Sequence, residues 1–252
     1  MFVLENVDNI VKIDNGECLE TILKALKSIK APIGSRITSA RVPLYEIHWK
    51  VLNTKENGVP QSRKRWYCVG LRKDQFEGGL TGKKSSFAWA ENIPCPPLAD
   101  FLDEWNSLDK PHIALQQSPS VRKNIQKAEL KIKAKGKDPT QIDYVIDCDK
   151  SAAHNCNYSP CITRSRDKGH WITSKKSRFN KQEMFRLQGM DPTTFKVAIS
   201  QTSLGKQIGN AMSVNVVERV IQSTLKAVGL LDQAALDRWA SGEALSKLKA
   251  SK

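Results

Sequence analysis

The sequence has no long apolar run, no visible leader segment and no repeats. Its apolar stretches stop well short of the ~20 residues that a membrane-spanning helix needs, so no membrane association is expected. The chain does not open on a basic segment followed by an apolar core and a small-residue cleavage site, so secretion is not expected either. The absence of internal repeats and low-complexity tracts leaves an ordinary globular protein.

A disulfide framework is also missing. The six cysteines are scattered as Cys18, Cys68, Cys95, Cys148, Cys156 and Cys161. This distribution is typical of a reduced, intracellular protein. We expect it in the nucleus if the source is eukaryotic, and otherwise in the cytoplasm or nucleoid. Three of these cysteines lie close to His154, but their spacing matches no common zinc motif. We therefore expect a polar loop there and no bound metal.

Acidic residues are few in comparison with basic ones. Lys and Arg number 40 and Asp and Glu 26, which gives a formal net charge of +14 and a sequence pI near 9.5. Lysine and arginine gain free energy by displacing counterions from phosphates, so this excess favours a nucleic acid partner over an inert basic surface. With 40% apolar and 26% charged residues, the 252-residue chain has a globular composition and can form one sizeable domain or two small ones.

The first part of the chain shows mixed α/β patterning. Residues 2–4 form a short apolar run that indicates the end of a buried strand. Residues 16–30 carry apolar side chains at helical spacing. Apolar and polar side chains alternate over residues 44–53, and a further strand is expected over residues 65–71. We expect these last two strands to pair as antiparallel neighbours. The helical stripe consists of Leu19, Ile22, Leu23, Leu26 and Ile29.

Residues 72–177 are richer in proline, lysine and irregular sequence. Within them, residues 121–137 are patterned as an amphipathic helix with lysines around one apolar face. The lysine-covered side is either an ordinary solvated surface or a contact to backbone phosphates. The apolar face consists of Val121, Ile125, Ala128 and Ile132.

Regular patterning returns at Asn180, which together with Glu183 forms a capping pair for a helix that runs to Gly189. A second helix is expected after residues 209–210, with an apolar face that ends at Gly229. One more short helix with a lysine-rich end is expected in the tail, over residues 230–252.

Four segments share one explanation. Glu5-Asn6-Val7 follow the first strand, and residues 58–70 read GVPQSRKRWYCVG. After a long variable stretch, residues 178–196 read RFNKQEMFRLQGMDPTTFK and residues 205–220 read GKQIGNAMSVNVVERV. Each segment alone is weakly specific. In this order and spacing they resemble the cytosine-5 DNA methyltransferase family, over nearly the whole chain up to about residue 228.

The resemblance implies an α/β fold, namely the C-terminal part of a Rossmann-like, S-adenosylmethionine-dependent methyltransferase sheet. Its C-terminal strands would occupy residues 1–71 and an inserted target-recognition domain residues 72–177. Returning catalytic-domain helices would occupy residues 178–229, followed by a helical basic tail over residues 230–252.

The family's chemistry explains the residue types near the first two segments. A cysteine thiolate adds to C6 of a flipped-out cytosine, C5 takes a methyl group from S-adenosylmethionine, and loss of the C5 proton then expels the cysteine. Negative charge moves toward N3 and O2 of the ring. By resemblance, the carboxyl at N3 belongs to Glu5, which we expect to be desolvated and protonated, and Asn6 orders the loop around it.

The arginine motif has three alternating polar residues, which we expect to point to one side of the chain. These are Gln61, Arg63 and Arg65. By resemblance, Arg65 contacts the cytosine O2 or the target phosphate, where a fixed cation stabilises developing charge, and Arg63 braces the site. The plain alternative is that the glutamate and the arginines belong to an ordinary surface.

Double-stranded DNA and S-adenosylmethionine are the partners that the resemblance implies. Residues 159–171 resemble the return from the recognition domain, and the basic helix offers phosphate contacts. The expected DNA contacts are Thr163, Arg164, Arg166, Lys131 and Lys133. Gly209, Asn210 and Ala211 resemble the segment that closes over the cofactor, with Asn210 near its methionine end. Since the family often has serine in place of Ala211, we expect no hydroxyl contact there.

The family's nucleophilic cysteine and glycine-rich cofactor loop precede its Glu-Asn-Val segment, whereas only Met1 to Leu4 precede Glu5 here. Pro94-Cys95 and Pro160-Cys161 resemble the nucleophilic dipeptide, but both follow the arginine motif and neither is expected to act. We therefore expect a C-terminal portion that is inactive alone and has an unpaired strand edge. It would be a truncated gene model, one half of a split enzyme whose N-terminal half is a separate chain, or a degenerate paralogue. A non-catalytic DNA-binding remnant and an RNA methyltransferase of the same superfamily remain alternatives.

Overall fold

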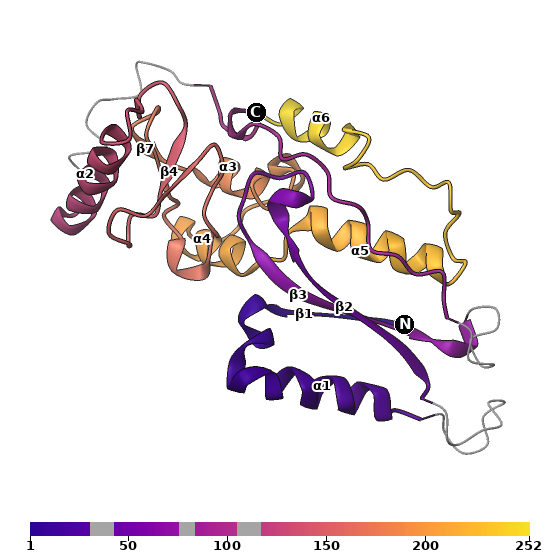
Figure 1. The fold of residues 1–252 in the computed structure, drawn as a ribbon. Helices are drawn as coiled ribbons and strands as arrows, with labels where there is room; N and C mark the ends of the chain where they lie inside the picture. Colours follow the sequence, from indigo (N-terminus) through magenta and orange to yellow (C-terminus); the bar gives the residue numbers. More distant parts are fainter. Residues whose placement is uncertain (31–42, 76–83, 105–116) are drawn as a thin grey trace. The chain divides into compact units, whose positions relative to one another are not determined.

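The computed structural model describes residues 1–30, 43–75, 84–104 and 117–252 (Figure 1). The chain forms two compact units, each assembled from stretches that are far apart in the sequence. The first unit comprises residues 1–53, 64–92 and 216–237, and the second comprises residues 54–63, 93–215 and 238–252. Among the described residues, no helix is both long enough and apolar enough to cross a membrane.

The first unit is built on a three-stranded antiparallel sheet with the order β1-β3-β2. The strands are β1 (Phe2–Val7), β2 (Tyr45–Asn53) and β3 (Lys64–Arg72). The predicted antiparallel pairing of the two later strands is confirmed, and β1 pairs with the other side of β3. Strand β1 does not end at Leu4 but continues to Val7, so Glu5 lies within the sheet.

The sheet of the first unit is covered on both faces because the side chains of β3 alternate between them. Trp66 and Cys68 pack in one apolar cluster with α1 (Glu17–Ser28). Tyr67 and Val69 pack in another cluster with α5 (Val214–Ala227). The sheet therefore lies between α1 and α5 (Figure 1). The predicted stripe of α1 faces the sheet, except for Ile29, which follows the helix and is exposed.

The second unit contains a four-stranded antiparallel sheet with the order β5-β4-β6-β7. Its strands are β4 (Tyr144–Ile146), β5 (His154–Cys156), β6 (Trp171–Ile172) and β7 (Ser177–Arg178). Helix α2 (Pro119–Lys133) packs against this sheet through the predicted apolar face. The strands themselves were not predicted, because two or three residues are too few to show an alternating pattern.

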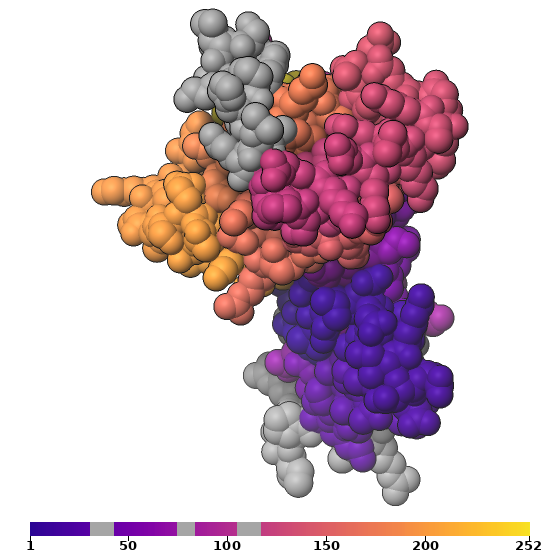
Figure 2. Space-filling model, turned by 90° about the vertical axis from the view of Figure 1, so that its left-hand side faces the viewer, coloured from indigo at the N-terminus to yellow at the C-terminus, as the bar shows by residue number. Residues whose placement is uncertain are grey.

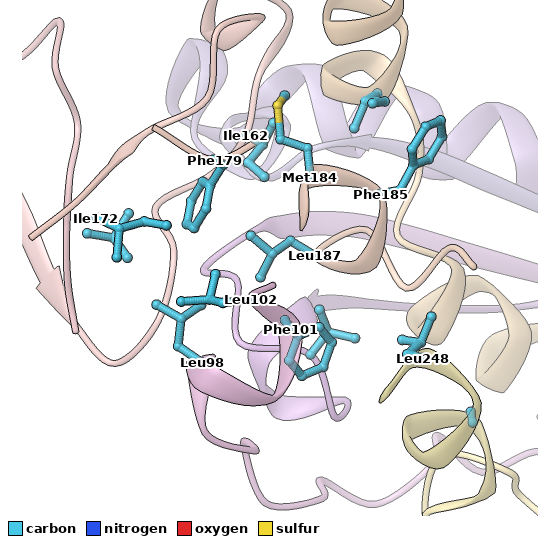
Figure 3. Packing of buried hydrophobic residues seen from close by; sticks show 14 of the residues in the cluster. Leu98, Phe101, Leu102, Ile162, Ile172, Phe179, Met184, Phe185, Leu187 and Leu248 are labelled. Atoms are coloured by element: carbon cyan, nitrogen blue, oxygen red, sulfur yellow. The ribbon is translucent and has the colours of Figure 1, made fainter. Parts of the chain in front are cut away.

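A larger apolar core joins the remaining helices of the second unit (Figure 3). It includes Phe101 and Leu187 beside Leu248 of the tail. The helices are α3 (Lys181–Arg186), α4 (Gln201–Asn210) and α6 (Glu243–Ala250). Short 3-10 helices are η1 (Asp8–Val11), η2 (Ile13–Gly16), η3 (Thr54–Glu56), η4 (Lys73–Gln75), η6 (Leu98–Phe101), η7 (Arg164–Arg166) and η8 (Pro192–Thr194).

Helix boundaries in the C-terminal part follow local capping. Asn180 and Glu183 form the predicted capping box at the start of α3. Helix α5 begins at Val214, and Gly229, with a φ of 72°, follows its end as expected. Helix α4 was not predicted, although the Ser200 side chain caps it. The tail forms a helix only from Glu243 onward, so the prediction of a helix starting at residue 230 was wrong in its extent.

Candidate functional site

Glu5 and Arg65 form an ion pair on adjacent strands of the first unit. Arg65 pairs across the ladder with Val7, which lies two residues beyond Glu5, so both side chains lie on one face of the sheet in diagonal positions. The Glu5 Oε1 atom is 3.2 Å from the Arg65 Nε atom, and the two side chains are 23% and 14% exposed. The Arg65 guanidinium therefore faces a carboxylate through Nε and donates to the Lys64 carbonyl through a terminal nitrogen, and both side chains of the ion pair remain partly open to solvent.

Asn6 has a different role from its neighbour. It is exposed, and its Oδ1 atom accepts a hydrogen bond of 2.8 Å from the Val7 backbone N–H. This bond lies where β1 ends and η1 begins. The side chain therefore fixes the chain direction just after Glu5, which is compatible with the predicted ordering of this loop.

Gln61 and Arg63 are both buried in the second unit, and both hold the Ile162 peptide. The Ile162 N–H donates to Gln61 Oε1 over 2.9 Å, and the Ile162 carbonyl accepts from an Arg63 terminal nitrogen over 2.8 Å. Gln61 also donates to the Leu187 carbonyl over 2.6 Å. These two side chains thus converge on one backbone segment. Arg65, two residues further along, belongs to the first unit and pairs with Glu5.

Arg63 also reaches the C-terminal end of α4. Its guanidinium donates to the Ala211 carbonyl over 2.7 Å and to the Gly209 carbonyl over 3.3 Å. The side chain is 3% exposed. Arg63 therefore ties Ile162 to the segment around Asn210 through charge-assisted hydrogen bonds, which are about twice as strong as neutral ones. Sequence reasoning predicted a bracing role, but it did not identify these partners.

The backbone of α4 lies directly against the backbone of residues 163–167. A Cβ atom added to Gly209 would lie well inside 3.0 Å of the Thr163 carbonyl group, and one added to Gly205 would meet the Asp167 carbonyl oxygen in the same way. Only glycine permits such an approach. Sequence reasoning singled out Gly209 but missed Gly205, although the four-residue spacing places both on one side of a helix.

A second buried polar network joins the turn after β2 to the start of α5. The Thr54 hydroxyl donates to the Ser213 hydroxyl over 2.8 Å, and Ser213 donates to Gln188 over 3.1 Å. The Asn215 amide donates to the carbonyls of Thr54 and Asn57. Sequence reasoning missed this network, because each of these hydrogen bonds joins residues that are more than twenty positions apart. It holds the ends of the segments that carry Gln61 and Asn210.

The residues expected to contact DNA differ in their surroundings. Arg164 is exposed and has no hydrogen-bond or ion-pair partner among the residues that the structure describes. Arg166 is engaged in ion pairs with Asp147 over 2.8 Å and with Asp149 over 3.0 Å. The Thr163 and Ser165 hydroxyls are 3.1 Å apart and share a hydrogen bond. Arg164 is therefore the residue of this turn with an uncompensated charge.

Lys131 and Lys133, the two candidate DNA contacts of the basic helix, are both exposed on α2 but face different groups. Lys131 lines a cavity at the end of the helix, whereas Lys133 lies close enough to Glu129 and Asp138 to lower the pKa of both carboxyls. Burial nevertheless leaves the pKa of Glu129 above its ordinary value.

Asn210 is the last residue of α4, and its side chain is exposed, with no partner in the described part of the chain. Its amide is therefore available to a ligand. A cavity of about 340 Å³ adjoins Ala211 and is lined mainly by apolar side chains, including Phe195 and Val197. The Asn210 side chain does not line this cavity, although the next residue, Ala211, does.

The cysteines near His154 do not converge in this structure. Cys148 is buried, and its thiol donates to the Ile146 carbonyl, whereas Cys156 is exposed. The Cys161 sulfur accepts a hydrogen bond of 3.4 Å from Arg63. Within the described ranges, no three His, Cys, Asp or Glu side chains are placed to hold a metal ion.

His170 is a buried neutral imidazole beside a buried carboxylate. Burial lowers the pKa of His170 to about 4, although Asp147, 3.9 Å away, acts to raise it. For Asp147, burial alone would raise the pKa, but the hydrogen bonds and charge of Arg166 bring it below its ordinary value. Since the Cys161 carbonyl can only accept, His170 Nε2 carries the proton that it shares over 3.3 Å.

This burial predicts a specific pH dependence of folding. In the unfolded chain His170 takes up a proton below its ordinary pKa, whereas the folded state resists it down to about pH 4, so stability falls as the pH falls through this window. Between pH 7 and pH 5 the loss is about 2 kcal/mol, because one pKa unit corresponds to about 1.4 kcal/mol. Urea unfolding of His170→Gln should show this loss reduced, and His154→Gln, a histidine that is not buried, should keep it. Equal pH dependence in both variants would contradict the assignment.

The comparisons with known proteins agree with one another. A model of the family described as C-5 cytosine-specific DNA methylase matches residues 1–226. The Type II methyltransferase M.HpaII of Haemophilus parainfluenzae is 25% identical over 239 residues, which are 91% of this chain and 61% of the relative. M.NgoBI of Neisseria gonorrhoeae is 27% identical over 218 residues, 86% of this chain and 58% of the relative. The chain therefore spans about three fifths of the length of these relatives.

A solved structure shows the same fold. A protein assigned as a DNA modification methyltransferase and encoded within an E. coli prophage has a TM-score of 0.55 at 15% identity, over 90% of this chain and 69% of that one. The fold class predicted from the sequence is confirmed: the chain has the α/β fold of such methyltransferases, with antiparallel sheets.

Proposed function

The chain belongs to the family of C-5 cytosine-specific DNA methylases, and from this membership we propose that it is the C-terminal part of a DNA (cytosine-5)-methyltransferase. The complete enzyme would transfer a methyl group from S-adenosylmethionine to C5 of a flipped-out cytosine. The observation that carries the proposal is the half-buried Glu5–Arg65 ion pair on adjacent strands. The matched relatives are longer than this chain, and we assign the nucleophile and the glycine-rich loop to the part of the enzyme outside it.

Glu5 and Arg65 fit the charge that develops on the cytosine ring. Addition of a thiolate at C6 moves negative charge to N3 and O2, which are neighbouring atoms of one ring edge. Glu5 can share a proton with N3, and Arg65 can hydrogen-bond to O2. Because the two groups are 3.2 Å apart on paired strands, they need little reorganisation to meet both atoms. The ring would replace part of the contact between them.

The cofactor-binding part of the proposal rests on the end of α4. S-adenosylmethionine, when bound, supplies the methyl group. The exposed Asn210 amide would hydrogen-bond to it, Gly209 keeps α4 close to residues 163–167, and Arg63 fixes the Ala211 carbonyl. In this arrangement Gln61 and Arg63 position the segment and do not touch the reacting atoms.

The DNA-binding part of the proposal rests on charge. The net charge of +14 favours duplex DNA through its phosphates. We assign residues 72–177 as the target-recognition region, with Thr163, Arg164 and Arg166 at its end. Arg164 has the free guanidinium, while Arg166 shapes the turn through its two aspartates. Such an enzyme would act wherever the cell keeps its DNA, in the nucleus or in the cytoplasm or nucleoid.

Replacing Glu5 or Arg65 is expected to reduce methyl transfer with little change in DNA affinity. The variants are made in the protein as it occurs in its source, which is recovered with an antibody to residues 230–252. In that protein Glu5→Gln should lower kcat by at least 100-fold, since general acid–base catalysis contributes a rate factor of about 10²–10⁴. Arg65→Gln should cost about 10²–10³. Glu17→Gln, an exposed carboxyl on α1, serves as the control and should leave kcat unchanged. Full activity of Glu5→Gln would contradict its role.

The reaction class itself is tested by covalent capture. Duplex DNA that contains 5-fluorocytosine, which cannot lose a C5 proton, should trap the native protein together with S-adenosylmethionine. We expect this 252-residue chain alone to form no adduct, because the nucleophile is assigned outside it. The same gel gives the apparent mass of the native protein. If the native protein also forms no covalent adduct, the enzyme proposal fails and the alternative of a DNA-binding remnant is favoured. Displacement of DNA by transfer RNA would favour an RNA substrate instead.

A further inference from the structure

The second unit has a cavity of about 390 Å³ where three lysines meet. It lies between the C-terminal end of α2 and the loop that joins β4 to β5. The side chains that matter to the argument are Lys131, Lys135, Lys150, His154, Asn155 and Asp147. Lys131 is among the expected DNA contacts, but neither the Glu5–Arg65 pair nor Asn210 belongs to this lining.

The positive charge of this cavity is not offset by its own acid. Asp147 is the acidic residue of the lining, but both of its oxygens are held by Arg166, over 2.8 and 3.2 Å. No ion pair within the described part of the chain involves Lys131, Lys135 or Lys150. Three lysines that line one cavity without a counter-charge repel one another, and a bound anion would relieve this repulsion.

The lining of the cavity also contains uncharged polar side chains. His154 Nδ1 lies 3.1 Å from the Ala152 carbonyl, so this nitrogen carries a proton and the ring orientation is fixed. The neighbouring Asn155 contributes an amide, and its backbone pairs with Val145 in the sheet. Both polar residues belong to β5, which is paired in the sheet.

The basic helix presents this cavity at the surface. Helix α2 buries Ile125 and Ala128 against the small sheet and leaves its basic side uncovered. It lies on the side of Figure 1 that Figure 2 turns toward the viewer. Lys131 and Lys133 are two positions apart on α2, but only Lys131 lines the cavity, since Lys133 lies near Glu129 and Asp138.

We propose that the cavity lined by Lys131, Lys135 and Lys150 binds a backbone phosphate of duplex DNA. The inference rests on the proposed function, in which DNA is the partner. Ammonium groups are compact charges that suit a phosphate oxygen without reading a base, so this contact positions the protein on DNA and adds no sequence preference. Its exposed position at the end of a basic helix favours a polymer backbone over a small phosphorylated metabolite.

The experiment measures the salt dependence of DNA binding by fluorescence anisotropy. Each lost phosphate contact should reduce the slope of log K against log salt by about 0.9, which corresponds to about fivefold weaker binding at 0.15 M salt. We expect this change for Lys131→Ala and for Lys135→Ala, on duplexes of any sequence. Lys123→Ala removes the same charge from the same helix at a position that does not line the cavity, and it should leave the slope unchanged. All three lysines are exposed, so the fold should persist, as circular dichroism checks.

Three outcomes would overturn this site. If Lys123→Ala changes the slope as much as Lys131→Ala does, the attraction is diffuse and no site exists. If none of the variants changes the slope, DNA does not reach the cavity. If millimolar inorganic phosphate binds the wild type but not Lys131→Ala, and does not displace DNA from the wild type, the site belongs to a small phosphate ligand. Methyl transfer by the native protein is measured in parallel, so failure of this site and failure of the proposed function are distinguishable.

Discussion

Replacing Arg63 with alanine is expected to lower the free energy of unfolding by about 4 kcal/mol. The variant leaves the buried carbonyls of Ile162 and Gly209 and the partly buried carbonyl of Ala211 without this donor. Each buried polar group that loses its partner costs about 1–3 kcal/mol. The missing side chain also opens a cavity in a closely packed region. Because whole domains are stable by only about 5–15 kcal/mol, this one change removes a large share of the stability.

Urea unfolding of the whole chain measures this effect, with Lys64→Ala as the control. Lys64 is the next residue and is exposed, so its loss should change stability by less than about 0.5 kcal/mol. Arg63→Lys keeps the positive charge but has no fork to reach the Ile162 and Ala211 carbonyls together. It should therefore remain well below the wild type. Wild-type stability of Arg63→Lys would show that charge alone, and not the fork, holds the two segments.

The consequence for function follows from what Arg63 joins. It links the segment before the candidate DNA contacts to the residue after Asn210. Even under conditions in which Arg63→Lys is folded, the orientation of Asn210 should be less well fixed than in the wild type. We therefore expect S-adenosylmethionine to bind this variant more weakly than it binds Lys64→Ala, when both are made in the native protein.

Local signals in the sequence predicted the longer elements well. The stripe of α1 and the alternation of β2 are periodic over enough residues to indicate their type. The Asn180–Glu183 pair placed the start of α3, because a capping box satisfies backbone groups within four residues. By contrast, β6 has two residues, and its existence depends on pairing with β4 and β7. No local pattern encodes such a strand.

The division into two units is a property of long-range packing. The chain passes from the first unit to the second after residue 53 and returns at residue 64, so ten residues of one unit interrupt two paired strands of the other. These residues carry Gln61 and Arg63, whereas the next strand carries Arg65. A pattern of alternating polar residues cannot reveal this division, since it depends on partners such as Ile162 that lie about a hundred residues away.

The candidate site shows the same limit. Glu5 and Arg65 were selected by a resemblance in residue type and order, and the strand register explains why they meet, as Arg65 pairs with the residue two beyond Glu5. Arg166 shows what residue type alone does not reveal. It was selected as a DNA contact because it is basic, yet Asp147 and Asp149 already engage it. Distinguishing a free cation from a paired one required the positions of residues that are distant in the sequence.

Replacing Gly209 with alanine is expected to destabilise the chain by about 3 kcal/mol, although the same change in an open helix normally stabilises it by about 0.5–1 kcal/mol. The added methyl would overlap the Thr163 carbonyl group, and a backbone atom cannot turn aside as a side chain can. Forced overpacking typically costs about 1–3 kcal/mol, and contact with backbone belongs to the upper part of that range.

Lys206→Ala, on the exposed side of α4, is the control and should change stability little. Urea unfolding shows whether Gly209→Ala lowers or raises the free energy of unfolding. A gain in stability for Gly209→Ala would mean that α4 stands away from residues 163–167, and that the segment carrying Asn210 is not held against the candidate DNA-binding turn.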